Sequence, residues 1–254
     1  MKTSQVTRGA IGLACAALLW QLVAMTPWGA AMPTFTATLA KLATDVSGSD
    51  FWMALAETVG VALLGLVSSA VVGILVGILI GSFPAFRYAT LAVLEFLKPV
   101  PPIVILPLLV LILGPTAKMA WLLVFFGCVL QIVMQTVDGV HDTDPVAKDT
   151  ARSYGMGRIE ILVRVVLPSA MPFIGTAMRV AAPVALIVTV VAGLLGGGPG
   201  LGNSILLAQN AGDYPSLYAL VLVLGLLGLV FIGLARTAER KLLHWHASYR
   251  EAVV

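Results

Sequence analysis

Charged side chains are scarce in this chain. Only 11% of its 254 residues are Asp, Glu, Lys or Arg, whereas soluble domains carry about 25%. Hydrophobic residues make up 59% of the chain, and the mean hydropathy is +1.02. A water-soluble fold of this length could not bury so much apolar surface, which excludes a soluble globular domain. The composition therefore predicts an integral membrane protein.

The motifs of metal binding and hydrolysis are also missing. Neither HExxH nor GxSxG occurs, and the two cysteines, Cys15 and Cys128, lie in separate apolar runs without a CxxC spacing. The stretch His244-Trp245-His246 has no further Cys or His nearby and is more typical of an interfacial Trp. We therefore expect a non-catalytic chain that holds no metal and no cofactor.

No phosphate-binding loop of the form GxxxxGK(S/T) is present. The glycine-rich stretch from Gly196 to Ser204 has no Lys before Ser204 and no preceding strand. It is interpreted as a flexible external turn before a short amphipathic piece from Ile205 to Ala211. The chain is therefore not expected to hydrolyse ATP itself.

Apolar runs separated by short connections predict an all-α polytopic membrane protein, with about six transmembrane helices in a single domain over residues 1–254. The first run is followed by Gly29-Ala30-Ala31, so a cleaved signal peptide is an alternative interpretation. The connection from Gly29 to Phe51 is too polar to span, and Phe83 to Arg87 is expected to be a short turn. The expected spans are 9–28, 56–82, 88–113, 117–137, 173–195 and 217–234.

Basic residues are distributed unevenly between the two sides of this arrangement. With the N-terminus inside, the outer side holds only Lys41 and Lys118. The positive-inside rule then predicts a multi-pass cytoplasmic (inner) membrane protein with both termini in the cytoplasm. Because the basic residues flank spans within a lipid bilayer, the net charge of +3 does not indicate a nucleic-acid partner. The inner-side residues are Lys2, Arg8, Arg87, Lys148, Arg152, Arg158, Arg164, Arg236, Arg240, Lys241 and Arg250.

Glycine recurs at every fourth position in the second run, at Gly73, Gly77 and Gly81. These residues lie along one helix face and permit close helix–helix approach. The stripe indicates a dimer seam, or it simply reflects how common glycine is in membrane helices.

Prolines interrupt the third run at Pro99, Pro101 and Pro102. A helix cannot continue regularly through them, because the amide donors are missing and the rings clash. Irregular backbone at membrane depth is tolerated only against protein or a water-filled path, so this segment is a candidate gate or pathway. Glu95 and Lys98 are close enough on a helix to pair. Alternatively, these residues mark the cytoplasmic start of the helix, with Lys98 snorkelling.

Arg179 lies inside the fifth run, where an arginine costs roughly 2.5–3.5 kcal/mol on insertion scales. It is therefore a candidate pathway residue that faces an anionic solute. The alternative is an intramolecular partner, such as Glu95 or a backbone carbonyl near Pro183.

The longest polar interruption is the loop 144–172. Its sequence predicts a helix from Val146 to Tyr154, a turn at Gly155-Met156-Gly157 and a second helix. Pro168 and Pro172 are expected to reset the direction of the chain before the next span. Helical spacing predicts one apolar face and one arginine face for the second helix. Such a pair suits docking into a partner's groove. The expected apolar face consists of Ile159, Leu162, Val163, Val166 and Leu167.

The loop also fits a known spacing: Glu-Ala-Ala, three residues, Gly, nine residues, Ile, one residue, Leu-Pro. Here the matching positions are Asp149-Thr150-Ala151, Gly155, Val165 and Leu167-Pro168, with Asp149, Thr150 and Val165 as mild departures. The pattern resembles the cytoplasmic loop of permease subunits of bacterial ABC importers. From about Leu55 to Trp245 the chain looks like the nitrate/sulfonate/taurine branch, whose Arg-Pro-x-Pro-Pro stretch is similar to Lys98–Pro102.

The resemblance implies a type I importer permease fold and an ATPase-coupling loop. It also implies two ATPase subunits that use ATP and Mg, a second permease copy and an extracytoplasmic solute-binding protein. The solute would be a small anion such as a sulfonate, taurine or nitrate, although Val61 stands where the branch often has Arg. The alternative function is a secondary transporter or channel without an ATPase. The implied coupling residues are Asp149, Ala151, Gly155, Gly157, Ile159, Leu162, Val165, Leu167 and Pro168.

Overall fold

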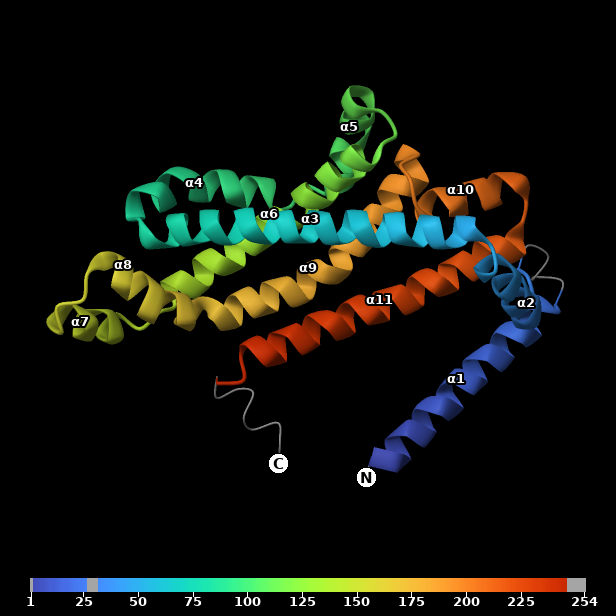
Figure 1. Ribbon diagram of the computed structural model, residues 1–254, viewed down its shortest axis with the longest axis horizontal. Helices are drawn as coiled ribbons and strands as arrows, with labels where there is room; N and C mark the ends of the chain where they lie inside the picture. The colour runs from blue at the N-terminus through green and yellow to red at the C-terminus, as the bar shows by residue number, and fades with distance from the viewer. Residues whose placement is uncertain (1, 27–31, 246–254) are drawn as a thin grey trace.

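The computed structural model describes residues 2–26 and 32–245, which are entirely helical apart from turns (Figure 1). Five helices are long and apolar enough to cross a membrane, and a bent pair makes a sixth candidate. The expectation of an all-α polytopic protein with about six spans is therefore confirmed. The long helices are α1 (Lys2–Ala24), α3 (Ser49–Ser82), α6 (Ala117–His141), α9 (Leu167–Gly196) and α11 (Tyr214–Leu242).

Shorter helices connect or flank the long ones. The bent pair consists of α4 (Pro84–Leu97) and the segment Pro102–Leu113, which contains a 3₁₀ turn and α5 (Leu106–Leu113). At one end of the bundle lie α7 (Pro145–Ser153) and α8 (Arg158–Ile161), and at the other end lie α2 (Phe35–Val46) and α10 (Leu201–Ala211) (Figure 1). The stretch from Gly29 to Ala31, the possible signal-peptide cleavage site, lies outside the described residues.

The centre of the bundle is a close, parallel contact between α3 and α6. Gly65 faces Val124, Gly73 faces Ile132, Gly77 faces Thr136 and Gly81 faces Val140, so both helices advance in the same direction. Ser69 continues this row and donates its hydroxyl to the carbonyl oxygens of Gly65, at 2.7 Å, and Phe125, at 3.1 Å. The glycine stripe is thus an intrachain seam rather than a dimer seam, because its partner helix belongs to the same chain.

Helix α9 completes the core by packing on both α6 and α3. Buried side chains of all three helices form one cluster, including Leu66, Leu123, Ile132, Ala181 and Ala185. The small residues of α9 allow a tight fit, and the Cys128 thiol lies 3.6 Å from the carbonyl oxygen of Ala181. Helix α11 then packs along α9 (Figure 1).

Two expected turns are much shorter than their sequences indicate. Only Phe83 separates α3 from α4, because Pro84 starts a helix, where its missing amide costs no hydrogen bond.

The glycine-rich stretch is not a flexible turn either, since α10 begins at Leu201 and the Leu201 amide donates to the Thr58 hydroxyl at 2.8 Å. A Cβ on Gly193 would lie 2.9 Å from the Asn203 nitrogen, so glycine lets α9 and α10 touch backbone to backbone.

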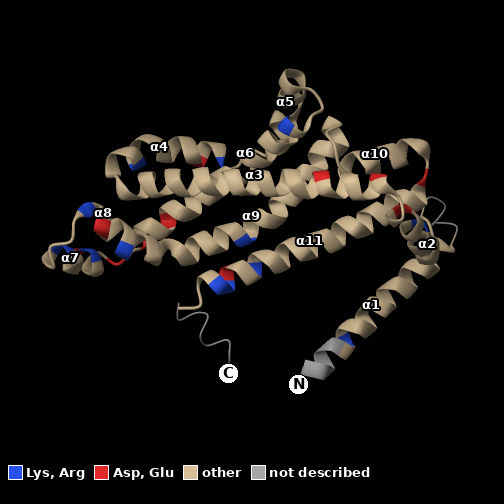
Figure 2. Cartoon of the chain, viewed as in Figure 1, with Lys and Arg blue, Asp and Glu red and all other residues tan. Residues whose placement is uncertain are grey.

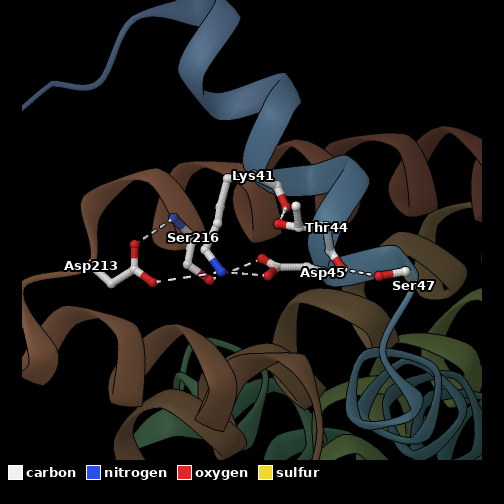
Figure 3. Close-up of polar contacts among 6 residues, drawn as sticks. All are labelled: Lys41, Thr44, Asp45, Ser47, Asp213 and Ser216. Carbon is white, nitrogen blue, oxygen red and sulfur yellow. Dashed lines mark hydrogen bonds and ion pairs between the residues drawn. The ribbon is translucent and has the colours of Figure 1, made fainter.

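Helix α2 is tied to the start of α11 by a polar cluster (Figure 3). The Lys41 ammonium lies 2.5 Å from the Asp45 carboxylate and 3.8 Å from Asp213, and the Ser216 hydroxyl donates to Asp45 at 3.1 Å. The hydrogen bond to Asp45 raises the pKa of Lys41 above its usual 10.5, against the opposing effect of partial burial. Lys41 therefore stays protonated at neutral pH and holds the two carboxylates together.

Helix α1 stands apart from the rest of the bundle (Figure 1). It is held near its C-terminal end, where the Trp20 indole donates to the Pro33 carbonyl at 3.0 Å and its ring packs on Phe35 and Tyr218. None of its candidate span, Thr7–Ala24, is buried. Leu13 is 75% exposed.

A methyl group added at the α3–α6 seam should destabilise the bundle. In Gly77→Ala the Cβ would lie 2.5 Å from the Thr136 Cβ and 2.9 Å from the Val133 carbonyl oxygen. Such overpacking costs about 1–3 kcal/mol, which lowers the melting temperature by roughly 3–10 °C. Gly60→Ala is the matched control, because a Cβ there meets nothing within 4 Å. Equal thermal unfolding of the two detergent-solubilised variants would contradict the role of the seam.

Candidate coupling surface and membrane pathway

Helix α7 and the turn after it have well-defined ends. The Asp144 carboxylate accepts the Val146 amide at 2.8 Å, which caps the start of α7. Gly155 has a φ of +79°, and the Met156 amide donates back to the Ala151 carbonyl at 3.1 Å. This is the hydrogen bond that closes a helix through a left-handed glycine. The predicted glycine turn is therefore present, and only a residue without a Cβ adopts it easily.

The second helix of the loop does not stop at the prolines. Helix α8, a π-helical turn (Leu162–Val166) and α9 form one continuous helix from Arg158 to Gly196. In the π turn the Leu167 amide donates a hydrogen bond to the Leu162 carbonyl, five residues earlier. This hydrogen-bonded turn is one residue wider than an α-helical turn, and it ends immediately before Pro168. The expectation that Pro168 and Pro172 reset the chain was wrong, because both are accommodated in the first turns of α9.

The loop is anchored to the membrane helices by a small core of its own. Ala151 from α7 and Ile161 from α8 are buried together with Val140 of α6 and Ile174 of α9. The Lys148 ammonium also reaches the Val140 carbonyl oxygen at 3.4 Å, near the end of α6. The loop therefore forms one packed unit with the ends of α6 and α9.

The π turn changes which side chains of the second helix face outward. Ile161, Val166 and Ala170 are buried, at spacings of five and four residues, because the inserted residue shifts the helical phase. Ile159 is 79% exposed and Val163 is 54% exposed. The prediction of a single apolar face was therefore wrong. Two of its five residues, Ile159 and Val163, lie on the outer face with the charged side chains.

The outer face is a shallow groove with an apolar strip and a charged border. Ile159 and Val163 line it together with Gly157, Arg158, Glu160 and Arg164. Arg164 pairs with Glu160 at 3.2 Å, and Tyr154 on the neighbouring turn is 84% exposed. Figure 2 shows charges of both signs gathered at this end. Exposed apolar residues rimmed by charge are typical of a protein interaction site.

The predicted coupling residues fall into three groups by exposure. Asp149 is exposed and pairs with Arg152 at 2.7 Å. Gly155, Gly157 and Ile159 are exposed, and Ala151 is buried. The remaining residues are half-buried and join the outer face to the packed core: Leu162, Val165, Leu167 and Pro168.

The proline stretch forms the sharp bend that the sequence predicts. Helix α4 ends at Leu97, the chain resumes a helical course at Pro102, and the two parts meet at 84°. Pro102 packs over Gly127 of α6, where an added Cβ would lie 3.3 Å from the proline ring. Pro99 and Pro101 are exposed between the two parts.

Glu95 and Lys98 do not form the ion pair that their spacing permits. Both side chains are exposed, and the structure of residues 32–245 places no ion pair between them. No residue of α4 is buried, although most of its residues are apolar. This bent segment therefore presents an uncovered face, which includes Val93, Phe96, Val100, Val104, Leu108 and Leu111.

Arg179 has an intramolecular partner that the sequence did not reveal. Its guanidinium lies 3.6 Å from the carboxylate of Glu239, whose side chain is 4% exposed. Gly175 leaves room for this carboxylate, since an added Cβ would lie 3.2 Å from the Glu239 Cγ. Glu239 was overlooked because it lies beyond the sixth apolar run, among Arg236, Arg240 and Lys241. A lone carboxylate among these three basic residues was the available signal.

These features define a multi-helix membrane protein with an exposed helical loop that packs on two of its candidate spans. The chain belongs to the family described as the binding-protein-dependent transport system inner membrane component, which matches residues 73–244. It is a multi-pass inner-membrane protein of the ABC transporter permease type, like its relatives.

Two similar relatives illustrate the family. The taurine transport system permease protein of Escherichia coli is 31% identical over 202 residues, covering 78% of this chain and 72% of the relative. The nitrate import permease protein of Leptolyngbya laminosa is 29% identical over 187 residues, covering 72% and 67%. The first is a taurine permease by name and the second a nitrate permease.

Solved structures share the fold. A bacterial ABC transporter involved in alginate import matches with a TM-score of 0.68 and 15% identity, over 94% of this chain and 93% of that one. The methionine ABC transporter MetNI, in inward-facing conformations, matches with a TM-score of 0.62 and 19% identity, over 73% and 92%. The fold is therefore that of an ABC importer permease.

Removal of the Arg179 cation should cost stability. Truncating one member of a buried charge pair costs about 2–5 kcal/mol, and we expect the lower end because Arg179 is 43% exposed. The double variant Arg179→Gln/Glu239→Gln should recover part of this loss in a double-mutant cycle of thermal unfolding. Arg236→Gln, at an exposed position, serves as the control. Strictly additive effects of the two substitutions would contradict a direct interaction.

Proposed function

We propose that this chain, as a single permease domain over residues 1–254, is the transmembrane subunit of an ATP-driven importer. Two partner ATPases supply the energy, and a second permease copy and an extracytoplasmic binding protein complete the assembly. The chain itself binds no cofactor, while its partners use ATP and Mg. The observation that carries the proposal is the exposed apolar strip of Ile159 and Val163, which lies on a helix continuous with α9.

The orientation of the chain follows from this assignment. The ATPases work in the cytoplasm, so α7 and α8 face the cytoplasm, as do both termini. The excess of Lys and Arg at this end agrees with the positive-inside rule. Helices α2 and α10 then lie on the outer side, where a binding protein would deliver solute.

The mechanism uses the continuity of the helix and the packing of the loop. An ATPase groove receives Ile159 and Val163, and closure of the ATPase pair displaces the docked loop. Because α8 continues into α9, and Ala151 and Ile161 pack on α6 and α9, the displacement moves these helices together. Two rigid copies that rock against each other then open alternately to either side of the membrane.

The second copy covers the bent segment between α4 and α5. This apolar face has no partner among the described residues, and irregular backbone at Pro99 and Pro101 needs protein or a water-filled path beside it. A pathway between two copies therefore includes this bend, with Glu95 on the last turn of α4 and Lys98 at the end of that helix. Arg179 is a weaker pathway candidate, since Glu239 already lies beside it.

Disruption of the docking surface should strongly weaken ATPase binding. Gly155→Pro cannot adopt the φ of +79° at this turn, and Ile159→Asp places a charge in the apolar strip. We expect each variant to lower capture of an ATPase with a GxxxxGK(S/T) loop at least about tenfold, as for an interface hot spot. Capture is measured by affinity purification from detergent-solubilised membranes, with mass spectrometry of the bound protein.

Leu39→Asp is the matched control, because it charges an exposed apolar residue at the opposite end of the bundle. If membrane-inserted wild type captures no such ATPase, the chain acts as a secondary transporter or channel. If Leu39→Asp lowers capture as much as Ile159→Asp, the proposed orientation is wrong.

The solute is proposed to be a small anion such as taurine, another sulfonate or nitrate. Support comes from the relatives, which include permeases named for taurine, nitrate and aliphatic sulfonates. Deletion of the gene should abolish uptake of one of these anions, and complementation by wild type, but not by Gly155→Pro, should restore it. Loss of uptake of an uncharged or cationic solute only would contradict the assignment.

A further inference from the structure

A cleft of about 610 Å³ lies between the α7–α8 loop and the corner where α3 passes into α4. Ser82, Phe83 and Pro84 line it from the corner, and Ile161 and Val166 line it from the second helix of the loop. Because Ile161 and Val166 are buried, the cleft lies on the side of that helix that faces the bundle. Its volume falls within the range of small-molecule sites, about 300–1,000 Å³.

The charged side chains of this cleft all have one sign. Lys148 and Arg152 line it from α7 and Arg158 lines it from α8, while no Asp or Glu is among its lining residues. The outer groove of α8 differs, because Glu160 lies there beside the arginines. Figure 2 shows the basic positions of α7 and α8 at the end of the bundle where α3 passes into α4. A cleft of this charge attracts an anion and repels a cation.

Two of these three cations lack a carboxylate partner. Arg152 pairs with Asp149 at 2.7 Å. Among the described residues, however, the Lys148 ammonium reaches only the Val140 carbonyl oxygen, at 3.4 Å, and the Arg158 guanidinium makes no hydrogen bond or ion pair. The positive-inside rule accounts for basic residues at this end of the bundle, but it does not account for their convergence on one cleft.

The cleft also contains polar donors that have no acceptor. The Ser82 hydroxyl is the only buried polar side-chain group within residues 2–26 and 32–245 that is left without a hydrogen-bond partner. An unmade hydrogen bond of this kind costs free energy, which a ligand in the cleft can recover. The continuous helix from Arg158 to Gly196 begins at the same cleft with no side-chain cap, so its first amides add to the positive potential.

We propose that this cleft binds a tetrahedral oxyanion, such as a phosphate group, between Lys148 and Arg158, with the Ser82 hydroxyl as a further donor. The guanidinium fork and the ammonium are the side-chain groups that bind such oxygens most strongly. An uncharged apolar ligand would gain nothing from the two cations. A bound oxyanion would link the loop to the end of α3 through one ligand.

The oxyanion has two sources at this position. With the orientation proposed above, the cleft lies at the cytoplasmic surface of the membrane, where free phosphate compounds and phospholipid headgroups both occur. Both present the same phosphate oxygens to Lys148 and Arg158. The test therefore uses one probe of each kind.

The test is isothermal titration calorimetry of the purified full-length chain in an uncharged detergent and a chloride buffer. The probes are inorganic phosphate and the short-chain lipid dihexanoylphosphatidylglycerol, and we expect saturable binding of at least one. Lys148→Gln/Arg158→Gln removes two charge-assisted contacts and should lower the affinity at least about tenfold. Ser82→Ala removes one neutral donor and should lower the affinity about fivefold. Binding of inorganic phosphate would assign the free anion, and binding of the lipid alone would assign the headgroup.

The matched control is Arg236→Gln/Lys241→Gln, which removes the same charge from exposed positions on α11. This control should bind the probe as wild type does. An equal loss of affinity in the two double variants would overturn the site, because it would show a response to net charge alone. Absence of saturable binding of both probes by folded wild type would also overturn it. Equal binding of zwitterionic dihexanoylphosphatidylcholine would show that apolar contact, and not the oxyanion, is recognised.

Anion binding is measured on the chain without an ATPase and is therefore independent of the proposed function. Failed anion binding with intact ATPase capture would overturn this site alone. Intact anion binding without ATPase capture would leave the site standing and overturn only the proposed function.

Discussion

The close approach of α3 to α6 is the constraint on which the rest of the bundle depends. Within a membrane, burial of apolar surface provides no drive between helices, so association relies on van der Waals contact and buried hydrogen bonds. Glycines at positions 65, 73, 77 and 81 bring the two backbones together, and the hydroxyl of Ser69 bridges them. Helix α9 then rests on this pair, and α11 rests on α9. A change in the spacing at the seam would therefore displace every later helix.

Much of this architecture follows from patterns along the chain. Apolar runs and prolines predict the helices and the bend, because the bilayer sets the length of a span and proline removes amide donors. The spacing of Asp149, Gly155 and Leu167-Pro168 locates the loop, and Gly155 marks the position that needs a positive φ. These features are local, so a single sequence is sufficient to find them.

The features that the sequence did not reveal depend on contacts between distant segments or on one inserted residue. Nothing near Gly77 indicates that its neighbour is Thr136 rather than a second copy. The π turn before Pro168 shifts the helical phase, and so a regular period assigns Ile159 and Val163 to the wrong face. Glu239 lies in a basic segment, and only the packing of α11 on α9 brings it to Arg179. Each of these requires the fold before it can be found.

The pairing of Arg179 with Glu239 also bears on how the protein is made. Synthesis proceeds from the N-terminus, so α9 reaches the membrane with its arginine sixty residues before the carboxylate exists. During that interval the insertion of α9 depends on the apolar residues around Arg179, which must outweigh a cost of roughly 2.5–3.5 kcal/mol. The counter-charge is supplied by α11, which is synthesised after α9. A chain that stops before Glu239 would thus leave the Arg179 charge in the membrane without this counter-charge, and completion of α11 supplies it.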